Sequence, residues 1–324
     1  MNSINTNASA MTALASLNQT NKMLNDTQNA ISTGFRVADA SDNAAYWSIA
    51  TTMRSDNKAL GTVQDALGLG AAKVDVTSTG LNSAIEVTNE IKAKLVAARE
   101  PGVDRTKVQS ELTELKNQLS SIVESSGFNG ENWLQNDTAS AIGNKQIVGS
   151  FNRSAGGEVS VTTINVNVTN LTLIGTSDEK LGILTKGYDS DALLDTPTGT
   201  ADRYRLIDTT TNTTAGAATG TVIAVSSSTT DAQLDAMIRV TDKIVSDMTT
   251  AAADLGSNGK RIEMQQDFVS NLMDSIDKGI SALVDADLNE ESTKLKALQA
   301  QQQLGIQSLS IANGNSQSIL SLFR

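Results

Sequence analysis

Both ends of the chain lack charged side chains, yet both carry apolar residues at helical spacing. No charged residue occurs in residues 1–21 or 297–323. Near the N-terminus Ala10, Leu17, Leu24 and Ile31 recur at intervals of seven, which is the period of a coiled-coil seam. The C-terminal stripe is interrupted by Gln302, Gly305 and Ser316, so a helix here would be marginal alone. We therefore predict that the two ends pair as antiparallel helices. The alternative is two frayed polar tails.

The apolar positions of the two stripes are the residues expected to pack in this pair and to support assembly. They are Ile4, Leu14, Leu17, Leu24 and Ile31 near the N-terminus, and Leu298, Leu309, Ile319 and Phe323 near the C-terminus. Stripes this narrow bury little surface within one chain. We therefore expect the molecule to pack side by side with copies of itself.

The composition excludes several classes of function. Of 324 residues, 39% are hydrophobic and 3% aromatic, which favours long helices over a thick globular core. A net charge of −11 argues against nucleic acid or an anionic membrane as a partner. With 0 cysteines and 0 histidines, thiolate chemistry, imidazole catalysis and histidine-bound metals are excluded. We predict no enzyme activity and no cofactor. We also expect no membrane span and no cleavable signal peptide.

Residues that end or cap helices divide the N-terminal half of the chain. Thr33-Gly34 should end a first helix, because glycine accepts the left-handed cap. Asp42 is expected to cap a second helix running from Asn43 to Arg99. Pro101-Gly102 turns the chain into a third helix, which Gly127 to Gly130 ends. The apolar stripe of this third helix consists of Val108, Leu112, Leu115, Leu119 and Ile122. Within the second helix, Gly68 and Gly70 are expected to allow another helix to approach closely.

The middle of the chain has a different character. Residues 138–230 are rich in Thr, Asn, Ser and Gly, and alternating residues predict a hairpin near 145–167 followed by a small β-rich insert. Helical spacing resumes from Leu234 to Leu283. The acidic stretch 285–291 then breaks the register and indicates a joint. Asp285, Asp287 and Asn289 copy the opening of a calcium loop, but Glu290 and Lys296 replace its essential glycine and glutamate.

The predicted fold is mainly α, with long antiparallel coiled-coil-like helices formed by paired N- and C-terminal regions. A β-hairpin and a small β-rich inserted domain lie in the middle. The expected domains are an inner helical layer (1–42 with 286–324), a helical rod with the hairpin (43–170 with 228–285) and a variable outer insert (171–227).

Several segments resemble bacterial flagellins. They are Ile4-Asn5-Thr6-Asn7, the stretch 31–45 with its motif residues Gly34, Arg36, Asp39, Asp42 and Asn43, Phe128-Asn129-Gly130, and the ending Leu320 to Arg324. The resemblance covers roughly 1–135 and 230–324. It implies a secreted, extracellular subunit that polymerises as a helical homopolymer into the bacterial flagellar filament for swimming motility.

The resemblance also implies partners: the flagellar type III export apparatus and a chaperone, hook-associated and cap proteins, and host immune receptors. Two alternatives stay open at this point. A hook–filament junction protein shares the terminal design, and a surface-displayed enzyme on a helical stalk would belong to another class. The sequence offers no clustered catalytic residues for the second alternative.

Overall fold

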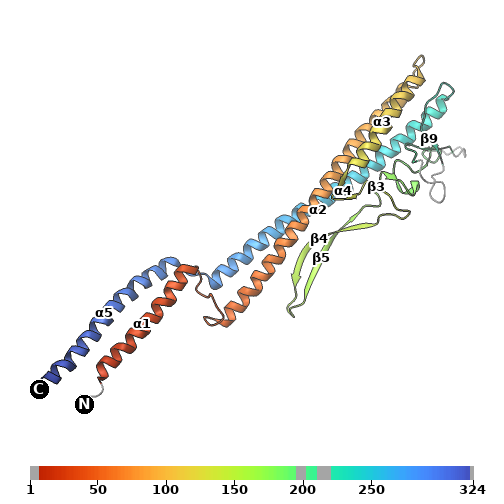
Figure 1. The fold of residues 1–324 in the computed structure, drawn as a ribbon. Coiled ribbons are helices and arrows are strands. Elements are labelled where there is room, and N and C mark those ends of the chain that lie inside the picture. Colours follow the sequence, from red (N-terminus) through yellow and green to blue (C-terminus); the bar gives the residue numbers. More distant parts are fainter. Residues whose placement is uncertain (1–6, 195–201, 210–219, 322–324) are drawn as a thin grey trace. The chain divides into compact units, whose positions relative to one another are not determined.

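The computed structural model describes residues 7–194, 202–209 and 220–321, and the side chains of α5 up to residue 314. The chain divides into two compact units, Met1–Ala59 with Asn271–Arg324 and Leu60–Ser270. Both are built mainly from long helices, and within the described ranges strands occur only in the middle of the sequence (Figure 1). The predicted fold class is therefore confirmed.

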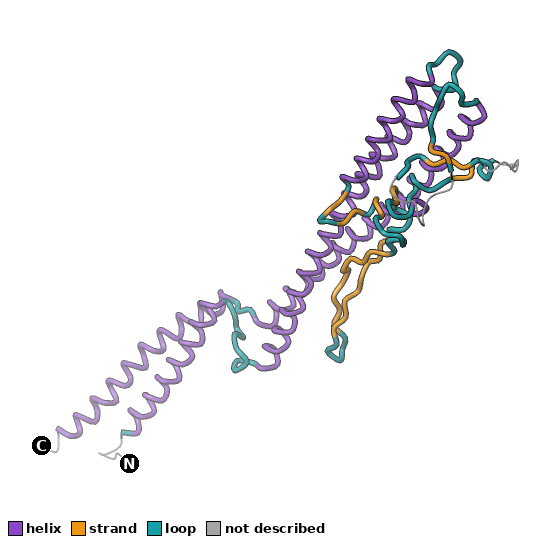
Figure 2. The backbone as a smooth tube through the Cα atoms, turned by 45° about the vertical axis from the view of Figure 1, so that its right-hand side comes forward, coloured by secondary structure: helices purple, strands orange, loops and turns teal. Residues whose placement is uncertain are grey.

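In the first unit, helices α1 (Ala8–Thr33) and α5 (Leu288–Ser321) lie side by side in opposite directions (Figures 1 and 2). Asn7 caps α1, because its side-chain oxygen accepts from the amide of Ala10 at 3.0 Å. Gly34 ends the helix in the left-handed conformation with φ 76°. The predicted antiparallel pair is confirmed, and so is the predicted end of the N-terminal helix at Gly34.

The joint between the helices of this unit is held by backbone pairing. Phe35 forms a β-bridge with Asp285, and the amide of Ala286 donates to the carbonyl of Gly34 at 2.9 Å. A small apolar core lies beside this bridge. It consists of Val37, Ala50, Ile280 and Val284, with Met53, Ile276 and Leu283 packed around it.

The second helix, α2 (Ala44–Ala97), starts as predicted but with a different cap. Asp42 does not cap it. The Asp42 carboxylate accepts from the amides of Ala38 and Asp39, at 2.9 and 3.1 Å. Asn43 supplies the cap, since its side-chain oxygen accepts from the amide of Tyr46. The predicted Asp42 cap is therefore wrong, because the loop before the helix uses this carboxylate.

In the second unit, parts of α2 and α4 (Asp231–Val284) run antiparallel, with α3 (Arg105–Ser125) packed against them. Ion pairs Lys92–Asp242 and Arg99–Asp235 fix the register of α2 against α4. The stripe predicted for α4 is buried at Ile244, Leu255 and Val269 among others. On α3 the stripe ends at Val123, which is buried, while Ile122 is half-buried.

The strands of this unit are mostly short, apart from one long hairpin. Strands β4 (Asn144–Arg153) and β5 (Val159–Asn167) form the predicted antiparallel hairpin, with a register shift between Val148 and Ser150. The remaining elements have two or three residues each. They are β1 (Gly127–Phe128), β2 (Glu131–Asn132), β3 (Gln135–Asn136), β6 (Ile174–Gly175), η1 (Glu179–Leu181), β7 (Tyr188–Asp189), β8 (Arg203–Arg205) and β9 (Thr221–Val222).

Gly70 has a different role from the one predicted. A Cβ there would lie 2.5 Å from a methyl group of Ile147, on the β-hairpin, and around Gly68 there is open space. The glycine therefore lets the Ile147 side chain, and with it the β-hairpin, lie close to α2.

Candidate assembly surface

The seam between α1 and α5 is built from apolar, amide and small side chains. Leu17 lies over Gly305, where a Cβ would be 3.2 Å from a Leu17 methyl group. The amide of Gln302 donates to the side-chain oxygen of Asn21 at 2.7 Å. Two of the three positions that interrupt the sequence stripe thus belong to the seam: Gly305 makes room for a leucine and Gln302 bonds to an asparagine.

The structure places the predicted site residues of this pair in three groups. Leu17, Leu24, Ile31, Leu298 and Leu309 lie in the seam, buried or half-buried. Leu14 lies outside it and is exposed. Ile4 and Phe323 are outside the described residues, as is the side chain of Ile319.

Sequence reasoning missed two threonines of the seam. Thr20 and Thr27 are the buried residues of α1, and they stand seven positions apart. Their seven-residue spacing matches the period of the seam, but threonine is a polar residue type and so adds nothing to an apolar pattern. The Thr20 hydroxyl donates to the carbonyl of Ser16 at 3.0 Å, so the side chain presents its methyl group to the seam.

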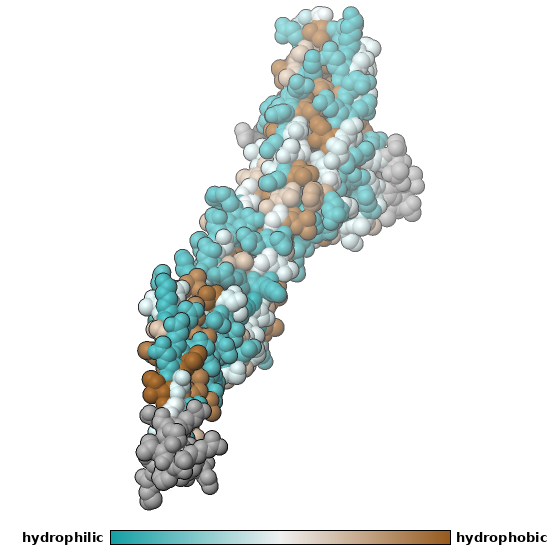
Figure 3. All heavy atoms as spheres, turned by 60° about the vertical axis from the view of Figure 1, so that its left-hand side comes forward, coloured by the Kyte–Doolittle hydropathy of each residue, from teal (hydrophilic) through white to brown (hydrophobic). Residues whose placement is uncertain are grey.

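Large apolar side chains remain exposed on this pair outside the seam. Met11 is 66% exposed, Leu304 64% and Ile311 67%, and Leu14, Met23 and Ile306 are exposed as well. Hydrophobic side chains at the surface of these two helices are visible in Figure 3. Exposed apolar side chains grouped on one surface usually mark a site where another molecule binds. We therefore expect these two helices to pack against another molecule.

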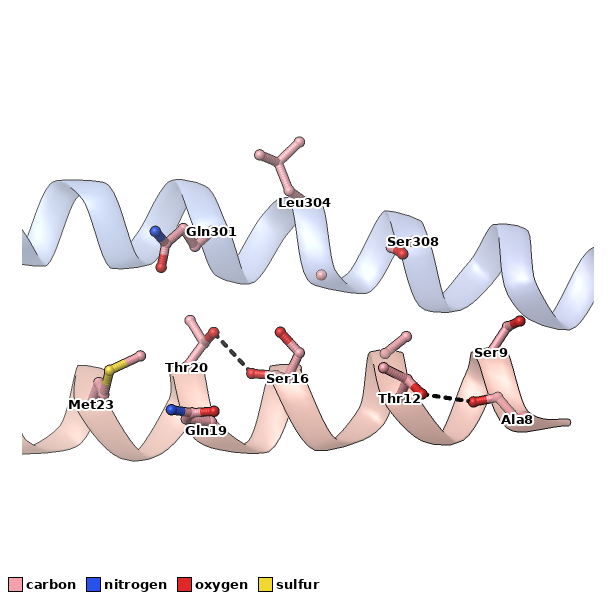
Figure 4. Close-up of a pocket in the computed structure, with 12 residues that line it drawn as sticks. Ala8, Ser9, Thr12, Ser16, Gln19, Thr20, Met23, Gln301, Leu304 and Ser308 are labelled. Carbon is pink, nitrogen blue, oxygen red and sulfur yellow. Dashed lines mark hydrogen bonds between the residues drawn. The ribbon is translucent and has the colours of Figure 1, made fainter.

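A groove of about 940 Å³ runs along one side of the pair. None of the 12 residues that line it is charged (Figure 4). On α1 they are Ala8, Ser9, Thr12, Ala13, Ser16, Gln19, Thr20 and Met23, and on α5 Gln301, Leu304, Gly305 and Ser308. The hydroxyls of Thr12 and Thr20 donate to carbonyls of their own helix.

An apolar ridge lies on the other side of the pair. It consists of Met11, Leu14 and Ile306, none of which lines the groove. At about 100° per residue, Leu14 points almost opposite to the groove-lining Ser16 and Gln19 of α1. The helix pair thus carries a groove on one side and a ridge on the other.

The motif residues at the end of α1 build the joint of this unit. Gly34 forms the left-handed cap, and the Arg36 guanidinium donates to the carbonyl of Leu283 at 3.0 Å. Asp42 accepts from the amide of Asp39, and Asn43 caps α2. These residues of one short stretch of sequence form the hydrogen bonds of the turn between the helices.

The described residues contain no group of three or more acidic side chains placed to hold a metal ion. Among them, too, no helix has the length and apolar character needed to span a membrane.

Comparison with known proteins identifies the family. Residues 4–139 match the family model of the bacterial flagellin N-terminal helical region, and residues 238–323 match that of the C-terminal helical region. The chain is 58% identical to Flagellin C of Rhizobium meliloti (strain 1021), with 100% of both chains covered. It is 42% identical to a flagellin of Brucella melitensis biotype 1, again over 100% of both chains.

Among solved structures, the crystal structure of Bacillus cereus flagellin is similar, with 17% identity and a TM-score of 0.36 over 64% of this chain and 88% of that chain. The two matched regions and the full-length relatives lead to one conclusion: the chain belongs to the bacterial flagellin family.

Proposed function

We propose that the α1–α5 pair is the surface through which this flagellin polymerises. As a flagellin, the protein is a structural subunit of the extracellular flagellar filament and not an enzyme. The residues that carry assembly are those of the groove and the ridge, together with the predicted Ile4, Ile319 and Phe323. The observation that carries the proposal is an uncharged groove and an exposed apolar ridge on opposite sides of one helix pair.

This arrangement favours an open polymer over a closed dimer. A two-fold dimer buries the same patch on both copies, whereas a ridge that enters the groove of the next copy leaves a ridge and a groove free at the ends. Repetition of such a contact gives a helical filament unless the rotation happens to close. The contact also removes the exposed leucine, isoleucine and methionine side chains from water.

The test is a substitution in the groove that leaves the free subunit intact. Leu304 is largely exposed, so Leu304→Asp should leave the helical circular dichroism signal unchanged. Burying the unpaired carboxylate costs several kcal/mol, so pelletable polymer should be lost. Leu304→Met is the matched control and should polymerise normally. Full polymerisation of Leu304→Asp would refute the proposed surface.

We further propose the layered domains that the sequence indicates. Residues 1–42 with 286–324 would form the inner layer, 43–170 with 228–285 the rod, and 171–227 the outer insert. The composition change in the insert supports this division. Filaments assembled from a chain with a shortened insert should be thinner but continuous in negative-stain micrographs.

Family membership also supports export by the flagellar type III apparatus with a chaperone, and contacts with hook-associated and cap proteins in the assembled flagellum. Host immune receptors are further candidate partners. The export proposal predicts that cells lacking the export apparatus retain the protein inside, while its amount in whole-cell extracts stays measurable. Secretion from such cells would contradict it.

A further inference from the structure

The described methionines fall into three environments: buried, half-buried (Met53 and Met273) and exposed. Met237 and Met248 are buried in the helical core of the second unit, and Met248 is 0% exposed. Met11 and Met23 are exposed on α1, and Met264 is exposed on α4. Thioether sulfur is oxidised where oxidant can reach it, so exposure separates the reactive methionines from the inert ones.

Met11 and Met23 lie on the two faces that the proposed polymer contact uses. Met11 belongs to the apolar ridge with Leu14, while Met23 lines the end of the groove and is labelled there in Figure 4. We propose that Met11 and Met23 are oxidation sites of the free subunit, and that their conversion to sulfoxides blocks polymerisation. This inference rests on the proposed assembly surface.

The reaction needs a peroxide. The sulfur of each methionine takes one oxygen atom from hydrogen peroxide, and the rest of the peroxide leaves as water. Sulfur loses two electrons and the peroxide gains them, so no other reactant is needed. The product is a polar, chiral sulfoxide in place of a flexible apolar side chain.

A sulfoxide at Met11 or Met23 would put a polar oxygen on a face that the proposed contact buries. On α1, the hydroxyls of Thr12 and Thr20 already donate to backbone carbonyls. The other two ridge residues, Leu14 and Ile306, have no hydrogen-bond donor in their side chains. Burying an unpaired acceptor costs enough free energy to raise the critical concentration for polymerisation by about tenfold or more. In the free subunit the sulfoxide stays in water and costs little.

The experiment treats full-length monomer with hydrogen peroxide, removes the oxidant and measures the critical concentration by pelleting. Wild type and Met264→Leu should both lose assembly on oxidation. The critical concentration of the double variant M11L/M23L should be the same before and after treatment, whatever its untreated value, because leucine cannot be oxidised. Equal loss of assembly in the double variant and in wild type would overturn the proposal.

A second measurement needs no variant. Partly oxidised wild-type protein is allowed to polymerise, and peptides from the pellet and the supernatant are compared by mass spectrometry. Trypsin cleaves after Lys22, so Met11 and Met23 fall in separate peptides. Sulfoxides at both positions should be concentrated in the supernatant. Equal sulfoxide content in both fractions would overturn this inference even if Leu304→Asp fails to polymerise, and the proposed assembly surface would then stand without it.

Discussion

Three residues show how single positions shape this protein: two glycines at close contacts and one lysine with a shifted pKa. Gly70 and Gly305 both leave room for a neighbouring side chain. Ile147 of the hairpin lies against Gly70, and Leu17 of α1 lies against Gly305. Lys116 on α3 is a different case. Its side chain is half-buried, and the ammonium donates to the carbonyl of Ile223, next to strand β9. Burial lowers the pKa of Lys116 to about 8.

The glycines give a matched pair of substitutions. Gly70→Ala should destabilise the protein by about 1–3 kcal/mol, because the new methyl overlaps Ile147. Gly68→Ala, two residues away with open space around it, should stabilise by up to about 1 kcal/mol through helix propensity alone. Urea unfolding of both variants measures the difference. Equal effects of the same sign would show that Gly70 does not seat the hairpin.

Lys116 predicts a stability that depends on pH. Its pKa is lowered in the folded state, so the unfolded chain binds more protons between pH 8 and the ordinary lysine value near 10.5. Stability therefore rises with pH across this window. Lys116→Met should lack this rise, so the stability difference between wild type and variant should change from pH 7 to pH 10. Parallel stability curves for the two proteins would contradict the assignment.

Among the elements, the long helices could be predicted and the short strands could not. A stripe repeated over many turns leaves little ambiguity, so the bounds of α1, α2 and α4 lie within a few residues of those expected. Strands of two residues, such as β6 and β9, carry no periodic signal, because tertiary pairing alone defines them. The Asp42 cap was misassigned since two neighbouring polar residues competed for one role.

The same distinction applies to the candidate site. The seam leucines followed from the seven-residue period, whereas the groove and the ridge depend on which side of α1 faces α5. The spacing of residues within one helix does not show which side of that helix faces its partner. Leu14 illustrates this: it continues the apolar pattern of α1 but lies on the exposed ridge.

The terminal pair predicts a clean effect of truncation. Removal of residues 297–324 deletes most of the α5 seam, including Leu298 and Gly305. The remaining helices keep their buried core, so circular dichroism should show most of the helical signal retained while polymerisation is abolished. Collapse of the whole helical signal would mean that the pair supports the fold and not only assembly.

For the whole molecule, charge sets the conditions of assembly. Subunits with a net charge of −11 repel each other, and sulfate both screens this repulsion and strengthens apolar burial. Light scattering should show little polymer at low ionic strength and rapid polymerisation in ammonium sulfate. Identical polymerisation in both conditions would contradict this view of the assembly.

The most direct test of the terminal pair as an assembly surface is limited trypsin digestion of monomer and polymer side by side. Lys22 lies on α1, and Lys294 and Lys296 lie on α5, all of them exposed. The pair is narrow and its apolar faces are uncovered in the free subunit, so local opening should be frequent. We expect rapid cleavage at these three lysines in the monomer and protection in the polymer. Equal cleavage at these sites in monomer and polymer would contradict the account.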